Sequence, residues 1–170
     1  MKAAIDAGEL AAHDPPAASP AADYSALPST VELLGGEAVI KRRIESKFDV
    51  HELLLAGLPN GSVTYLIRSI PELKDQSFFQ KAIGMSLRTF QRKNAGKNVL
   101  TSAQSGKTWN FAEIMAQATS VFGTKEAAIA WLNKPALALE GKVPLDLLDT
   151  SAGHEMVRDL LGRFEYGVYT

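Results

Sequence analysis

Three histidines and no cysteine limit the catalytic chemistry that this chain can carry out. His13 lies in an alanine- and proline-rich stretch, and His51 and His154 are far apart in the sequence. The chain has no thiolate nucleophile, no H-x-x-x-H pair, no glycine-rich phosphate loop and no Gly-x-Ser-x-Gly elbow. We therefore expect a protein that is not an enzyme, with no cofactor, no metal site and no small-molecule substrate.

Recognition of a polyanion is the chemistry that the sequence does indicate. Between residues 81 and 107 six basic side chains occur without an acidic one, although the net charge of the whole chain is −1. Arg and Gln side chains can read base edges in the major groove of DNA, and Lys neutralises phosphates. The side chains expected to contact DNA are Arg88, Thr89, Gln91, Arg92, Lys93 and Lys97.

A helix, a tight turn and a second helix are expected to position these side chains, over about residues 77–93. Phe78 and Ile83 belong to the apolar face of the first helix, and Gly84 allows it to stop sharply because glycine accepts a positive φ. Ser86 can cap the second helix, in which Phe90 faces inward. A solvated basic helix in a helical bundle would give the same pattern, so that alternative stays open.

Helical spacing of apolar residues extends over most of the chain, and no segment shows the sustained alternation of a strand. We therefore expect an all-α fold, with a helix-turn-helix in its N-terminal helical region and a small helical C-terminal domain. The expected N-caps are Ser29 or Thr30, Asp49, Thr124 and Thr150. The last helix is expected to turn one stripe inward, formed by Met156, Val157, Leu160, Leu161 and Phe164.

Three segments are expected from the composition. Residues 1–28 are rich in alanine and proline and are expected to form a flexible arm, because they offer little apolar surface to bury. Residues 29–98 form the region with the helix-turn-helix, and residues 99–170 form the C-terminal domain. No apolar run approaches the length of a membrane helix, so we expect a cytoplasmic protein that does not bind membranes.

Two stretches resemble a known family. The run Ile-Gly-Met-Ser-x-x-Thr-Phe-x-Arg over residues 83–92 resembles the helix-turn-helix of Xre repressors, although Gln80 and Lys93 depart from its usual small and apolar residues. The C-terminal third resembles the toxin-binding domain of Xre/MbcA/ParS antitoxins, and the resemblance covers roughly residues 48–170. Its motifs are Ala130-Trp131-Leu132 with Pro135, Gly141-x-x-Pro144-x-x-Leu147-Leu148-x-Thr150-x-x-Gly153, Val157-x-x-Leu160-Leu161 and Tyr166-Gly167-Val168-Tyr169.

The resemblance implies an antitoxin of a type II toxin–antitoxin pair. Its partner would be an RES-domain toxin that consumes NAD, and the antitoxin would bind the toxin and occlude its active site. It would also bind operator DNA and repress its own operon, as a homodimer within a larger toxin–antitoxin complex. The toxin contacts implied are Trp131, Leu147, Leu148, Thr150, Gly153, Tyr166, Gly167, Val168 and Tyr169.

Two other functions stay open. The chain could be a stand-alone helix-turn-helix repressor whose C-terminal domain dimerises, or a protein-binding module in which the helix-turn-helix is structural. The implied contacts have simpler roles as well. Trp131 and the Leu147-Leu148 pair could belong to the core, Thr150 could be only a cap, and Gly153 only a site of close packing.

Overall fold

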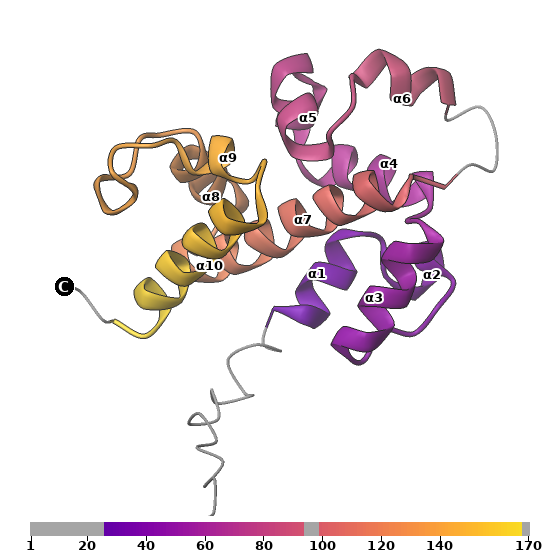
Figure 1. The fold of residues 1–170 in the computed structure, drawn as a ribbon, viewed down its shortest axis with the longest axis horizontal. Helices are drawn as coiled ribbons and strands as arrows, with labels where there is room; N and C mark the ends of the chain where they lie inside the picture. Colours follow the sequence, from indigo (N-terminus) through magenta and orange to yellow (C-terminus); the bar gives the residue numbers. More distant parts are fainter. Residues whose placement is uncertain (1–25, 94–98, 168–170) are drawn as a thin grey trace, which may run out of the picture.

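The computed structural model describes residues 26–93 and 99–167 (Figure 1). Within these two ranges the chain forms ten α-helices, two 3₁₀ helices and no β-strand, which confirms the all-α prediction. None of the described helices is long and apolar enough to cross a membrane. The elements are α1 (Leu27–Leu33), α2 (Gly36–Ile40), α3 (Lys47–Ala56), α4 (Asn60–Ser69), η1 (Pro71–Lys74), α5 (Gln76–Ile83), α6 (Leu87–Lys93), α7 (Ser102–Phe122), α8 (Lys125–Leu132), η2 (Leu137–Leu139), α9 (Pro144–Leu147) and α10 (Ser151–Glu165).

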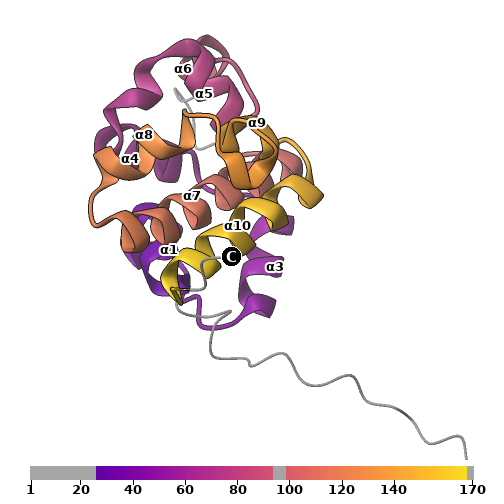
Figure 2. The same cartoon turned by 90° about the vertical axis from the view of Figure 1, so that its left-hand side faces the viewer.

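The long helix α7 runs through the middle of the molecule, as both views show (Figures 1 and 2). It begins with a capping box, in which the Gln104 amide donates to Thr101 Oγ1 at 3.2 Å and the Thr101 amide donates to Gln104 Oε1 at 3.2 Å. It ends at Gly123, whose φ is 86°. Helices α1, α3 and α5 pack on α7 from the preceding part of the chain, and α8 and α10 pack on it from the following part.

One buried hydrophobic cluster contains residues from both predicted regions, 29–98 and 99–170. Leu66 and Phe79 contribute from the first region, and Phe111 and Leu161 from the second. The rings of Phe78 and Phe111 meet edge to face with centroids 5.9 Å apart. The boundary between residues 98 and 99 stays a prediction, and residues 1–25 of the predicted arm lie outside the described residues.

The first described helix starts earlier than predicted. Helix α1 begins at Leu27, so the prediction that Ser29 or Thr30 caps it is wrong. Pro28 lies in the first turn, where the missing amide hydrogen costs nothing because the helix has no partner for it there. Thr30 is fully buried, and its hydroxyl donates to the carbonyl of Ala26 at 2.7 Å.

Helix α3 is capped by Ser46 rather than by Asp49, which corrects a second prediction. The Asp49 amide donates to Ser46 Oγ at 3.1 Å, and the Ser46 amide donates to Asp49 Oδ2 at 2.9 Å. This is a capping box, and Asp49 is its third helical residue. The predicted caps Thr124 and Thr150 are confirmed, since the amides of Ala127 and Gly153 donate to their hydroxyls at 3.1 and 3.0 Å.

Candidate functional site

A helix, a turn and a helix carry the predicted DNA-contacting side chains. Asp75 caps α5 by accepting from the Phe78 amide at 2.8 Å, and the helix stops at Gly84, whose φ is 82°. After the turn, Ser86 Oγ accepts from the Thr89 amide at 3.1 Å in the first turn of α6. The stop at Gly84 and the cap at Ser86 confirm the sequence prediction, whereas the sequence analysis did not identify Asp75 as a cap.

Helix α6 presents most of the predicted residues to solvent. Arg88, Gln91, Arg92 and Lys93 are exposed, while Phe90 is buried. Its ring lies 5.7 Å from that of Phe79 on α5. Thr89 is half-buried and accepts from the Ser86 hydroxyl at 2.8 Å, so it belongs to the cap as well, and Lys97 lies outside the described residues.

The basic stretch is less isolated in space than in sequence. Lys81 Nζ lies 2.5 Å from Asp146 Oδ1, and Lys107 Nζ lies 2.5 Å from Asp149 Oδ1. Both carboxylates come from the C-terminal third, at or just after α9. The sequence could not reveal these pairs, because 65 and 42 residues separate their members.

The predicted toxin contacts differ in how far they are buried, and three of them belong wholly or partly to the core. Leu148 is buried in the core, and Leu147 is half-buried. Trp131 is half-buried in an aromatic cluster, with its ring 5.3 Å from that of Phe122 and 6.2 Å from that of Phe164. These side chains fix the position of α8 and α9 against α10, and only part of their surface remains available to another protein.

Thr150 and Gly153 have a structural role in the start of α10. Thr150 is its N-cap, and Gly153 is buried. A Cβ on Gly153 would lie 2.0 Å from the carbonyl oxygen of Leu147, so only glycine fits at this position. The polypeptide can therefore turn from α9 into α10 with its backbones in close contact.

Three large apolar side chains in the C-terminal third are open to solvent. Tyr166, predicted as a contact, is 64% exposed, and Gly167 beside it is exposed too. Leu137 is 96% exposed and was missed, although its place between Pro135 and Gly141 indicates a loop. Met156 is 49% exposed, so its predicted inward orientation is wrong. The predicted contacts Val168 and Tyr169 lie outside the described residues.

The structure brings two histidines together that the sequence keeps apart. His51 and His154 both line a pocket of about 350 Å³ among α1, α3, α7 and α10. His154 is buried, and its Nε2 lies 3.1 Å from Glu113 Oε2 without being aligned for a hydrogen bond. The one hydroxyl in that lining, on Thr30, already donates to the Ala26 carbonyl, so neither histidine can take its proton in this arrangement.

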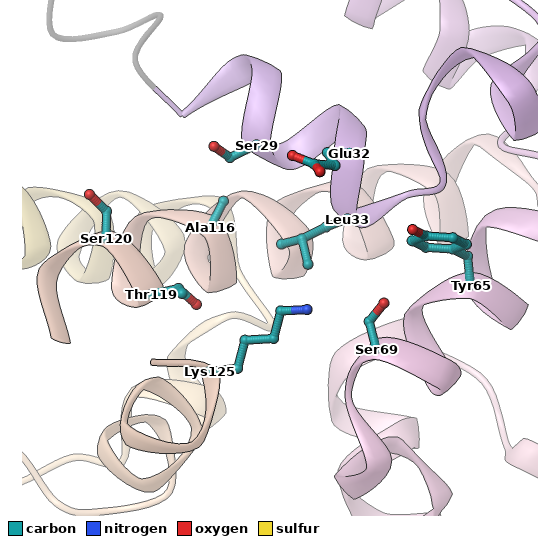
Figure 3. A pocket seen from close by; sticks show the side chains of 9 residues that line it. All are labelled: Ser29, Glu32, Leu33, Tyr65, Ser69, Ala116, Thr119, Ser120 and Lys125. Carbon is teal, nitrogen blue, oxygen red and sulfur yellow. The ribbon is translucent and has the colours of Figure 1, made fainter. Parts of the chain in front are cut away.

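A second pocket, of about 370 Å³, lies among α1, α4, α7 and α8 (Figure 3). The Lys125 amine extends into it, and Glu32 lies on the opposite side (Figure 3). Hydroxyl groups of Ser, Thr and Tyr supply most of the remaining polar lining, over a floor formed by Leu33 and Ala116. Among the described residues, no three His, Cys, Asp or Glu side chains are grouped closely enough to hold a metal ion.

Comparison with known proteins identifies the C-terminal third. Residues 117–167 match the family described as the antitoxin Xre/MbcA/ParS C-terminal toxin-binding domain. An "Antitoxin Xre" of Yersinia enterocolitica is 32% identical over 107 residues, which cover 62% of this chain and 70% of that protein. This chain belongs to the Xre/MbcA/ParS antitoxin family. It functions as the antitoxin of a toxin–antitoxin pair, and its partner is a toxin.

Other proteins named as antitoxins are similar to this chain over comparable lengths. An "Antitoxin Xre" of Photorhabdus laumondii is 28% identical over 125 residues, covering 70% of this chain and 80% of the relative. A "Prs ADP-ribosylating antitoxin" of a Sphingobium species is 28% identical over 104 residues, covering 56% of this chain and 65% of that relative. These relatives are all named antitoxins, and the matched toxin-binding segment contains Leu137, Met156 and Tyr166.

Proposed function

We propose that this antitoxin binds an RES-domain toxin in the cytoplasm and covers the site at which that toxin consumes NAD. The observation that carries this proposal is the exposure of Leu137, Met156 and Tyr166 within the segment matched to the toxin-binding domain. Exposed apolar and aromatic side chains of this kind are typical anchors of a protein interface. The Sphingobium relative supports the toxin class, because its name refers to ADP-ribosylation, a reaction in which NAD is the donor.

Co-expression with the protein encoded beside this chain tests this proposal directly. A stable complex and restored cellular NAD are the expected results for the full chain. A chain truncated before Gly167 should lose neutralisation because it lacks the predicted contacts Gly167, Val168 and Tyr169. The variant Tyr166→Ala should lose it because it removes the exposed ring next to them. Normal neutralisation by both variants would contradict the proposed contact at this end, and the absence of any complex with an RES-domain protein would overturn the proposed toxin class.

We also propose that α6 binds operator DNA and that the antitoxin thereby represses its own operon. Arg88, Gln91 and Arg92 are exposed together on α6, on the second helix of a helix–turn–helix arrangement. Such a helix can enter the major groove, where Arg and Gln reach base edges.

DNA binding is tested with Arg88→Ala and Arg92→Ala, on a duplex taken from upstream of the gene. Each variant should bind the duplex more weakly than the wild type and neutralise the toxin normally. Arg163→Ala, on α10, removes the same charge at the other end of the chain and is the control. A slope of log affinity against log salt near zero would contradict DNA binding, because each phosphate contact contributes about −0.9.

The antitoxin is proposed to be a homodimer that joins two copies through α3. Phe48 and Leu55 are seven residues apart in α3, about two helical turns, and therefore lie on the same side of the helix. They are 69% and 64% exposed, whereas Leu53 in the same helix is buried. A second copy of the chain is the occupant proposed for this face, because a two-fold dimer reads paired half-sites on DNA. Sedimentation of the double variant Phe48→Ser/Leu55→Ser should give a monomer, and an unchanged dimer would exclude this interface.

A further inference from the structure

A polar pocket of about 370 Å³ lies beside the turn that joins α5 to α6. Its lining consists of Ser77, Gln80, Lys81, Gly84, Lys107 and Asp149. The stem of Lys107 lies over the turn itself, because a Cβ on Gly84 would be only 2.9 Å from Lys107 Cδ. Two ammonium groups and two neutral hydrogen-bonding side chains therefore converge next to the start of α6.

Both ammonium groups already have an anionic partner from the C-terminal third. Lys81 is paired with Asp146, and Lys107 with Asp149. The pairs are open to water, since the side chains of Lys81 and Asp146 are 44% and 51% exposed and those of Lys107 and Asp149 are 25% and 59% exposed. Exposed ion pairs contribute little to stability, so these lysines can exchange one anion for another at low cost.

We propose that Lys81 and Lys107 form a binding site for phosphates of the DNA backbone, which Asp146 and Asp149 cover in the free protein. The proposal rests on the DNA binding by α6 proposed above. Helix α5 lies between α9 and α6 and contacts both, so a duplex held by α6 brings its backbone alongside α5 (Figure 1). Contacts to phosphate from Lys, Ser and Gln side chains are the usual means of fixing a protein's position on a duplex.

The two aspartates then compete with DNA for the same lysines. Each carboxylate must give up its lysine before a phosphate can take its place, and it repels the phosphate that approaches. The C-terminal third, which carries the toxin-binding domain, therefore weakens DNA binding through two side chains that touch α5 and α7. Movement of α9 would change the affinity for DNA without any change in α6.

The test uses the full chain with Asp146→Asn, Asp149→Asn and the double variant. Affinity is measured by fluorescence anisotropy over a series of salt concentrations, with the upstream duplex and a mixed-sequence duplex of equal length. Each Asn variant should bind both duplexes about two- to five-fold more tightly, which corresponds to the usual strength of an exposed ion pair. In the double variant, Lys81→Ala or Lys107→Ala should reduce the salt slope by about 0.9 each.

Generic charge effects are separated by a matched control and a double-mutant cycle. Asp159→Asn with Glu165→Gln removes two exposed negative charges from α10 and should tighten binding less. The gain from Asp146→Asn should vanish when Lys81→Ala is also present, and the gain from Asp149→Asn should vanish with Lys107→Ala. A gain equal to that of the control, or one that persists without the lysines, overturns the phosphate site.

The same measurements separate a failure of this site from a failure of DNA binding. If wild-type binding is salt-dependent and lost in Arg88→Ala, while the aspartate variants behave like the control, only the phosphate site is overturned. If no variant binds either duplex in a salt-dependent way and Arg88→Ala changes nothing, the proposed DNA binding fails, and the phosphate site is overturned with it.

Discussion

Gly153 shows how a residue of the family motif can act through the fold. The sequence left open whether this glycine contacts the toxin or allows close packing. It is buried, and the nearest atom to its missing Cβ is the Leu147 carbonyl oxygen. The distance in sequence between Gly153 and the residues Leu147 and Thr150 is therefore set by the geometry of the turn between α9 and α10. A substitution of Gly153 would affect toxin binding by changing that turn.

Gly153→Ala should destabilise the fold by about 1–3 kcal/mol, because the added methyl group forces the two backbones apart. Gly162→Ala, in the same helix, is the matched control, since its Cβ would have Gln117 Nε2 at 3.8 Å as its nearest neighbour. That change should stabilise α10 by about 0.5–1 kcal/mol. Chemical denaturation of both variants measures the two effects, and equal stabilities would contradict the packing role of Gly153.

Asp49 gives a residue-level dependence of stability on pH. The hydrogen bond from the Ser46 hydroxyl, followed by the one from the Glu45 amide, holds the pKa of Asp49 below its ordinary value of 3.8. A carboxyl whose pKa is lowered by folding stabilises the fold above pH 3.8, and that contribution is lost as the pH falls through the folded-state pKa.

Asp49→Asn should therefore lower the thermal midpoint at neutral pH, and its difference from the wild type should shrink as the pH falls below 3.8. Ser46→Ala removes the main cause of the lowered pKa, so Asp49→Asn should add little pH dependence in that background. Thermal unfolding of the four chains over a pH series gives the comparison. A difference that stays constant with pH would contradict the role of the ionised carboxylate.

At the scale of single helices, the sequence predicted those helix ends that are set by residues close to them in the chain. Thr124, Thr150 and Gly84 were identified as helix ends because caps and positive-φ glycines act within one turn. The start of α3 was placed wrongly because Ser46 and Asp49 are both good caps, and only the reciprocal bonds decide between them.

Long-range relations within the candidate site were not predictable in this way. The Lys81–Asp146 pair and the approach of His154 to Glu113 depend on how α9 and α10 pack on α5 and α7, which no local pattern encodes. Met156 was assigned to the buried stripe as the first position of an i, i+1, i+4, i+5, i+8 pattern of apolar residues. Successive helical residues differ by about 100° in direction, so it lies at the edge of that stripe instead.

Substitutions on the two sides of α10 should have different effects, because one side is exposed and the other packs on the core. Met156→Asp places a charge on the exposed side of the helix and should weaken the toxin complex while leaving thermal stability nearly unchanged. Phe164→Ala removes a half-buried ring that packs on Phe122 and Trp131. It should destabilise the fold, but by less than the about 3–5 kcal/mol that is typical of a fully buried ring. Affinity and thermal unfolding of both variants decide the assignment, and a Met156→Asp chain that unfolds early would contradict it.

At the scale of the whole molecule, α7 serves both predicted regions at once. Its buried side chains face α1, α3 and α5 as well as α8 and α10. Cutting the chain at the predicted boundary would therefore leave half of this helix without its partners, although the family match is confined to residues 117–167.

A fragment of residues 99–170 should fold poorly on its own. Phe111 would lose the ring of Phe78, and Trp109, which is 6% exposed in the full chain, would lose its cover on the N-terminal side. We expect lower helicity by circular dichroism and strong binding of a hydrophobic dye. Adding residues 26–93 as a second chain should restore the native signals, and a fragment as stable as the full chain would show that the two regions are independent.

The two tryptophans give the antitoxin a pair of separate optical reporters. Trp109 is buried within α7, so its emission should be blue-shifted and should follow global unfolding. Trp131 is half-buried between Phe122 and Phe164 beside α10, so its emission should respond to a toxin that covers this surface. A chain with Trp109→Phe would therefore read out the arrival of the toxin from native fluorescence alone, without an attached dye.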